Sequence, residues 1–125
     1  MYYSLINLIK KKKLKYRMSL ETWYHVSFDK NKVYRDVEPS GEEAWKDEFL
    51  WEAIIRICFK PNDFLSSDEL YIFTSERPES YLIPTEADGG SNLWAEIIEK
   101  GFFDAELSIE AATATEGIYC WPADE

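Results

Sequence analysis

The sequence predicts an α+β fold in which an antiparallel sheet, made of an N-terminal hairpin and a three-stranded meander, is packed by a C-terminal amphipathic helix. Three observations lead to this class. Segments rich in aromatic and β-branched residues alternate with turn residues over much of the chain. A later segment repeats apolar residues at helical spacing. Hydrophobic residues make up 46% of the 125 residues, which is too apolar for a disordered chain.

The hairpin is predicted from two strand-like segments, Thr22–Phe28 and Val33–Val37, joined by the turn sequence DKNK. Residues 39–41 contain Pro, Ser and Gly and break the chain. The next segment, 42–50, fits either one helical turn or an acidic loop with Trp45 tucked inward. The sequence leaves both alternatives open.

The meander is predicted from three further strands. Residues 51–59 are apolar on both faces, as in a central strand, with Ile55 and Ile57 expected on the same face. Residues 69–75 and 81–83 supply the second and third strands. The residues that we expect to be buried together, with the helix laid on the meander, are Ile55, Ile57, Ile72, Trp94, Ile97 and Ile98.

The amphipathic helix follows a Gly-Gly pair, with Ser91 as its expected N-cap and Gly101 as the residue just past its end. Asp104 could cap a second short helix. The segment 105–113 fits a strand as well, and its alanine content favours the helix. Residues 117–121 are expected to form a final strand or a packed tail.

Charge divides the chain into two parts. Residues 1–17 hold six of the fourteen Lys and Arg residues and no acid, leaving eight basic residues against all 24 acidic ones in the remainder, a net charge near −16. We therefore predict a basic leader at 1–17 that lies outside the fold and a single acidic α+β domain at 18–125.

The leader has two open interpretations. It could be a basic amphipathic segment that lies on a membrane or on RNA, or an upstream stretch, with the natural start at Met18. A secretory signal is rejected, because the positive charges follow the apolar stretch instead of preceding it. Since no apolar run is long enough to span a bilayer, we expect a cytoplasmic protein.

The order of elements resembles that of the bacterial pleckstrin-homology-like modules. The resemblance covers residues 20–101 and depends on pattern alone: a hairpin, a long apolar strand opened by Trp51, a short strand ending in YLIP at 81–84, and a closing helix that ends at Gly101. It implies a small barrel closed by a helix. The chain departs from the family in having fewer clear strands than a seven-stranded barrel and about 24 further residues after the helix.

Few residues can carry metal or nucleophile chemistry. His25 is the single histidine, so zinc sites that need two histidines are excluded, and the HExxH motif is absent. Cys58 and Cys120 lie in apolar segments and are expected to be reduced, buried and slow to react. No phosphate-binding glycine motif is present. We predict no catalytic residues, no bound metal and no cofactor.

The sequence favours a non-enzymatic binding module for a basic protein partner, with a toxin-neutralising, immunity-like protein as one version. A strongly acidic chain repels nucleic acid and anionic membranes and steers basic proteins toward it. The alternatives are a small enzyme that uses carboxylates and a structural or accessory subunit. The candidate partner-binding residues, chosen as an acidic cluster around an aromatic anchor, are Glu42, Glu43, Trp45, Asp47 and Glu48.

Overall fold

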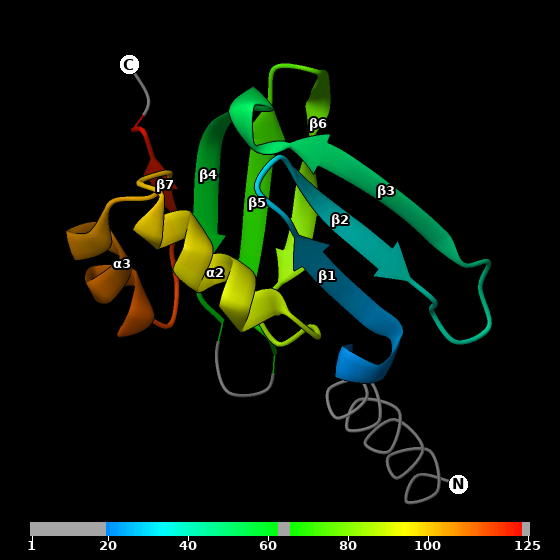
Figure 1. The fold of residues 1–125 in the computed structure, drawn as a ribbon. Coiled ribbons are helices and arrows are strands. Elements are labelled where there is room, and N and C mark those ends of the chain that lie inside the picture. Colours follow the sequence, from blue (N-terminus) through cyan, green and yellow to red (C-terminus); the bar gives the residue numbers. More distant parts are fainter. Residues whose placement is uncertain (1–19, 63–65, 124–125) are drawn as a thin grey trace, which may run out of the picture.

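The computed structural model describes residues 20–62 and 66–123, which form an α+β fold of two antiparallel sheets and two short helices near the C-terminus (Figure 1). The first sheet has the strand order β1-β2-β3, and the second has the order β6-β5-β4-β7. The elements are β1 (Tyr24–Phe28), β2 (Lys32–Val37), β3 (Trp45–Leu50), the 3-10 turn η1 (Trp51–Ala53), β4 (Ile54–Lys60), β5 (Glu69–Thr74), β6 (Arg77–Pro84), α2 (Gly90–Glu99), α3 (Ala105–Ala112) and β7 (Tyr119–Trp121).

The predicted N-terminal hairpin is confirmed as β1 and β2, which pair from Tyr24↔Val37 to Phe28↔Val33. The Asp29 carboxylate closes the turn by accepting the backbone N–H groups of Asn31 and Lys32, each at 2.8 Å. A short acceptor side chain at the first turn position is the usual chemistry of such a turn.

The segment 42–50 is neither a helical turn nor a loop throughout, since its second half is the strand β3, paired with β2. The hairpin is therefore part of a three-stranded sheet. The sequence concealed this strand because the residue facing inward between Trp45 and Phe49 is Asp47. A charge at an inward position breaks the apolar alternation that marks a half-buried strand. Asp47 is tolerated there because it pairs with Arg35 on β2.

The strand predicted at 51–59 begins three residues late. Trp51–Ala53 form the 3-10 turn η1, and β4 follows with a bulge between Ile54 and Arg56. A bulge shifts the alternation of side chains by one residue. Ile55 consequently lies on the surface with 57% of its area exposed, whereas Ile57 is fully buried. The prediction that both face the core is wrong for Ile55.

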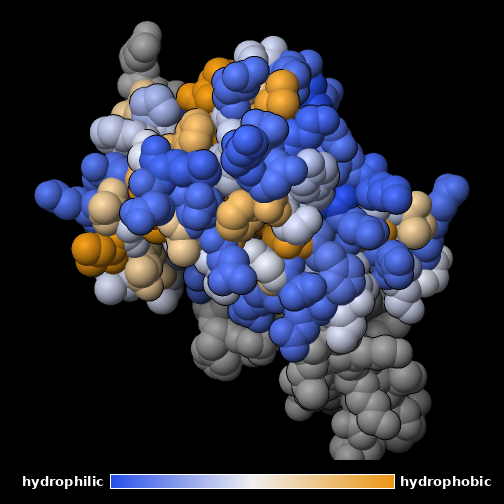
Figure 2. Space-filling model, viewed as in Figure 1, coloured by the Kyte–Doolittle hydropathy of each residue, from blue (hydrophilic) through white to orange (hydrophobic). Residues whose placement is uncertain are grey.

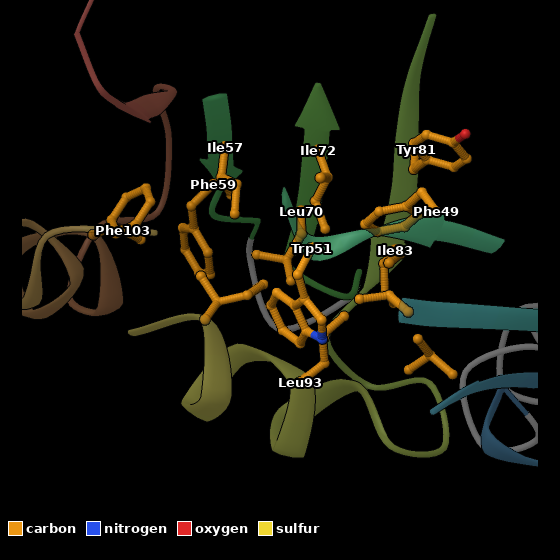
Figure 3. Packing of buried hydrophobic residues seen from close by; sticks show 14 residues of the cluster. Phe49, Trp51, Ile57, Phe59, Leu70, Ile72, Tyr81, Ile83, Leu93 and Phe103 are labelled. Carbon is orange, nitrogen blue, oxygen red and sulfur yellow. The ribbon is translucent and has the colours of Figure 1, made fainter. Parts of the chain in front are cut away.

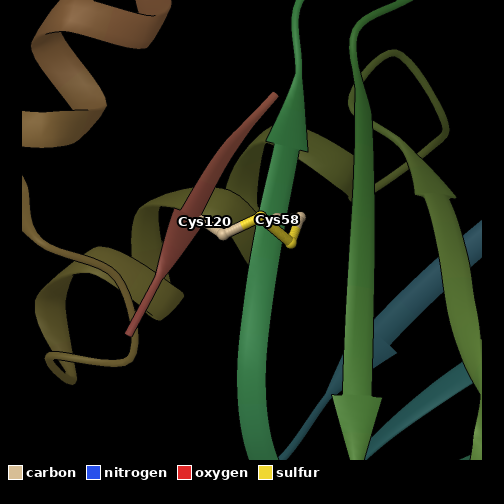
Figure 4. The surroundings of a disulfide bond; sticks show 2 residues. All are labelled: Cys58 and Cys120. Carbon is tan, nitrogen blue, oxygen red and sulfur yellow. A yellow bond between two sulfur atoms is a disulfide. The ribbon is translucent and has the colours of Figure 1, made fainter. Parts of the chain in front are cut away.

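The meander of β4, β5 and β6 is confirmed, and β7 extends this sheet by pairing with β4. Cys58 lies directly opposite Cys120 in that pairing, and the two form a disulfide (Figure 4). The prediction of two reduced cysteines is thus wrong. The spacing of 62 residues hid the pair, because only the return of the chain beside β4 brings the two sulfurs together.

The two helices begin and end at identifiable signals. α2 starts after Gly89 (φ 83°), so Ser91 is not its N-cap as predicted. Its C-terminus is closed as expected by Gly101 (φ 83°), where Phe102 N–H donates to the Ile97 carbonyl at 3.0 Å. The predicted cap of the second helix is also confirmed, since the Asp104 side chain accepts the first-turn N–H of α3 at 2.9 Å.

One core joins the two sheets to α2 (Figure 3). Ile57, Ile72 and Ile97 are fully buried in it, as predicted. Trp94 and Ile98 are only partly buried and pack against its border. The largest side chains that are fully buried are Phe49, Phe103, Ile57, Leu70, Ile72, Ile83, Leu93, Ile97 and Val33.

The predicted leader at 1–17 and the predicted start at Met18 lie outside the described residues. Within the described part, no helix has the length and apolar character that a membrane crossing needs. Disulfides are rare in cytosolic proteins. The cytoplasmic location therefore stays a prediction, and the Cys58–Cys120 bond does not support it.

Candidate binding surface

The predicted partner-binding residues lie on β3 and the loop that leads into it. β3 is an edge strand, since β2 is its single neighbour in the first sheet. Successive side chains of a strand point to opposite faces. Trp45 and Asp47 therefore share the inner face with the buried Phe49, while Glu48 lies on the outer face. Glu42 and Glu43 precede the strand in the exposed loop.

Arg35 organises the inner face of this sheet. Its side chain is 8% exposed, and it holds the Asp47 carboxylate through two hydrogen bonds, from Nε at 2.9 Å and from an Nη at 2.6 Å. Such a two-point pair fixes the orientation of both groups as well as their distance. Burial lowers the pKa of Arg35, but the hydrogen bonds that it donates to Asp47 and to the Tyr24 hydroxyl outweigh this effect, so the pKa lies above its ordinary value.

The same guanidinium joins the two sheets. Its other Nη donates to the Tyr24 hydroxyl at 3.2 Å and to the Leu82 carbonyl of β6 at 3.0 Å. The Tyr24 hydroxyl also donates to the Leu82 carbonyl. Burial raises the pKa of Tyr24, so the phenol keeps its proton and remains a donor. Side chains of β1 and β2 thus satisfy a carbonyl of β6, which a backbone N–H of a neighbouring strand would otherwise do.

Aromatic rings and guanidinium groups follow one another across this junction. The Arg35 guanidinium carbon lies 4.7 Å from the Trp45 ring centre and 5.0 Å from that of Tyr81. The Arg77 guanidinium lies 3.6 Å from the same Tyr81 ring. Each contact of this kind is worth about 0.5–1 kcal/mol at an exposed site. The series Trp45, Arg35, Tyr81 and Arg77, which we call the ladder, holds the exposed Trp45 ring in one orientation.

Trp45 is the open end of the ladder. It is 41% exposed and is therefore not tucked inward, which was one of the two alternatives for residues 42–50. The reason is its position near the start of β3, where the hairpin of β2 and β3 extends away from β6 (Figure 1). Beneath it, the Tyr24 ring makes an edge contact at 6.5 Å. Leu82 of β6, another exposed apolar side chain, is 38% exposed.

The structure separates the four predicted acids into two kinds. Asp47 is paired with the buried Arg35, and Glu48 on the outer face is paired with Lys32. Their charges are therefore largely cancelled within the sheet. Glu42 and Glu43 are exposed, and no ion pair joins either of them to another described residue. These two are the acids that remain available to a partner.

Sequence reasoning also missed the pair formed by His25 and Asp88. The His25 Nδ1 lies 2.8 Å from an Asp88 carboxylate oxygen, and its Nε2 lies 3.1 Å from the Thr22 carbonyl. The bond to Asp88 is the main cause that raises the pKa of His25. No local signal announces this pair, since 63 residues separate its members. With both ring nitrogens facing acceptors, His25 ties β1 to the loop before α2.

The carboxylates of the described residues differ in their surroundings. They contain no group of three His, Cys, Asp or Glu side chains arranged to hold a metal ion. Several carboxylates are held by donors: Asp29 accepts the Tyr34 hydroxyl at 2.7 Å, and this bond is the main reason that the pKa of Asp29 is lowered. An open hollow beside Asp88 is lined by Glu21 and Glu86, together with the hydroxyl side chains Thr85 and Ser91.

The exposed apolar side chains are scattered over the described residues. Figure 2 shows that the face seen in Figure 1 is mainly hydrophilic, with apolar residues in small separate groups. Among the described residues, the large apolar side chains left exposed are Trp45, Ile55, Leu82, Ile109, Ile118 and Trp121. Among these, Trp45 is the one held by the ladder. A rigid aromatic side chain costs little entropy to bury in an interface.

No family model, curated protein or solved structure matches this chain. The resemblance to the bacterial pleckstrin-homology-like modules consequently stays a prediction, and the function has to be argued from the residues themselves.

Proposed function

We propose that the protein is a non-enzymatic binding module for a basic protein partner, and that the partner contacts Trp45 at the start of β3. The observation that carries this proposal is the ladder, which holds a 41% exposed tryptophan over a buried arginine. Hot spots of interfaces are enriched in tryptophan, and pre-ordering such a side chain lowers the entropic cost of binding.

Charge supports a basic partner. The described residues contain 21 acidic and eight basic side chains, a net charge of −13. A field of this sign speeds the approach of positive proteins and slows that of nucleic acid. Glu42 and Glu43 lie within a few residues of Trp45 and carry uncancelled charge beside the anchor. A toxin-neutralising role is one form that this function takes.

The test starts with capture of partners from the native cell, followed by kinetics with the purified partner. We expect a basic protein whose association slows sharply between ~50 and 500 mM salt, because exposed charges are screened beyond about 10 Å. Trp45→Ala should raise the dissociation constant by roughly 30-fold or more, which is the scale of a hot spot. Reversing Glu42 and Glu43 to Lys should lower the association rate.

Matched controls come from the far side of the chain. Trp121 is 39% exposed, so Trp121→Ala removes a tryptophan of equal exposure away from the ladder. Reversal of the exposed Glu106 and Glu110 on α3 makes the same change in net charge as reversal of Glu42 and Glu43. If control and test variants weaken binding equally, or if the partner is acidic, the proposed function is wrong.

A further inference from the structure

Three of the four sheet edges formed by the described residues are blocked. Asp88 covers the edge of β1 with two backbone hydrogen bonds, from Val26 N–H at 2.8 Å and to the Tyr24 carbonyl at 2.9 Å. β7 has only three residues and is followed by a proline. β6 carries two prolines of its own, and its Leu82 carbonyl is already bound by side chains. Prolines, short strands and covered edges all prevent further pairing.

β3 has none of these protections. The Trp51 N–H donates to the Asn31 carbonyl at 3.0 Å, and this bond fixes which residues of β3 form backbone hydrogen bonds with β2. Trp45, Asp47 and Phe49 then exchange hydrogen bonds with β2. Their neighbours Lys46, Glu48 and Leu50 direct their N–H and C=O groups outward. No backbone hydrogen bond reaches these three from any other described element.

The side chains at this edge define what can pair with it. A strand laid beside β3 would place alternate residues on the inner face, beside the exposed Trp45. Apolar residues suit those positions. Its end would lie beside the loop of Glu42 and Glu43, where basic residues suit the uncancelled charge. A second copy of this chain is disfavoured as occupant, because each copy carries the net charge of −13 over its described residues.

We propose that the partner binds by strand addition: an extended segment of alternating apolar and basic residues pairs with the backbone of Lys46, Glu48 and Leu50 on β3. This inference rests on the proposed function and specifies how the basic partner is held. Main-chain hydrogen bonds supply affinity in such complexes, and alternate side chains supply specificity.

Hydrogen exchange of the full chain, followed by NMR, tests the pairing with a defined probe, a synthetic peptide of about eight residues that alternates Lys and Val. In the free protein, the amides of Lys46, Glu48 and Leu50 should exchange fast, and those of Asp47 and Phe49 slowly. At low salt the peptide should slow exchange of the first three by about tenfold or more. If no β3 amide gains protection, the inference is wrong.

Two further comparisons separate backbone pairing from side-chain contact. Glu48→Pro removes an outward N–H, whereas Glu48→Ala keeps it; we expect only the former to weaken peptide binding tenfold or more. Methylating alternate peptide nitrogens should abolish binding for one alternate set and leave it nearly unchanged for the other. This second comparison needs no variant of the protein. Equal effects of the two methylation sets would overturn strand addition.

The outcome distinguishes this inference from the function on which it rests. A natural partner that depends on Trp45 and on salt but ignores Glu48→Pro, with the variant folded, would refute strand addition and keep the binding module. A partner indifferent to Trp45, Glu42 and Glu43 would refute the binding module itself. Protection of the β3 amides that rises with protein concentration in the absence of peptide would identify a second copy as occupant and overturn the proposal.

Discussion

The disulfide offers the sharpest test of the fold. Cys58 on β4 and Cys120 on β7 are joined across 62 residues, a stretch that includes β5, β6 and both helices. The bond therefore closes a loop of about half the chain. Replacing both cysteines by Ala, or reducing the bond with a dithiol, opens that loop in the unfolded state while β4 and β5 keep their pairing in the folded one.

The expected loss follows from the length of the loop. Closing a loop of this length restricts the unfolded chain by about 4 kcal/mol at room temperature in the chain-entropy model. A small protein is stable by about 5–15 kcal/mol, so the bond accounts for a large share of the total. Cys58 is 7% exposed, and the Ala variant also loses some buried sulfur surface. We expect a loss of about 3–5 kcal/mol.

Urea unfolding of the oxidised, reduced and double-Ala forms measures this loss. The reduced and double-Ala forms should agree within about 1 kcal/mol and should unfold with a larger denaturant slope, because an open unfolded chain exposes more surface. Thiol counting on the unreduced, unfolded chain should find no free thiol. Two free thiols there, or a loss below about 1 kcal/mol, would refute the pairing and the position of β7 beside β4.

Three further perturbations test separate parts of the fold. Ile57→Ala should cost about 2–5 kcal/mol and Ile55→Ala less than about 1 kcal/mol, and equal costs in urea unfolding would contradict the bulge in β4. The pKa of His25 is raised in the folded state, chiefly by the hydrogen bond with Asp88. The contribution of His25 to folding stability is therefore complete below pH 6.5 and is lost as the pH rises through the folded pKa. The stability of the wild type should fall over that interval relative to His25→Gln, and parallel pH profiles would count against the tie to Asp88. Gly89→Ala should lower stability by about 2 kcal/mol or more, because φ is +83° and a Cβ would strike the Val26 carbonyl; an unchanged melting temperature would show that the entry to α2 is wrong.

Local patterns were sufficient for much of the fold. The hairpin of β1 and β2, the meander and the cap of α3 by Asp104 all depend on residues close together in the chain. Alternation of side chains, turn chemistry and capping act over a few residues, so the sequence alone reveals them. The candidate anchor Trp45 was chosen in the same way, because it stands among acids in the sequence, and its role stays a proposal.

Contacts between distant segments decided the rest. Asp47 interrupts the apolar alternation of β3 and is held at its inward position by Arg35. Arg35 in turn donates to the Leu82 carbonyl of the other sheet. The disulfide likewise needed the chain to return beside β4. No local sequence pattern predicts these contacts between distant segments, because the free energy of a buried charge or a cross-link depends on what lies opposite it in space. The sequence by itself determined the class, most of the strands and the acidic surface. Only the tertiary structure decided which acids pair with a basic side chain, which strand edge has no described neighbour, and that a tryptophan is held at the surface by a buried arginine.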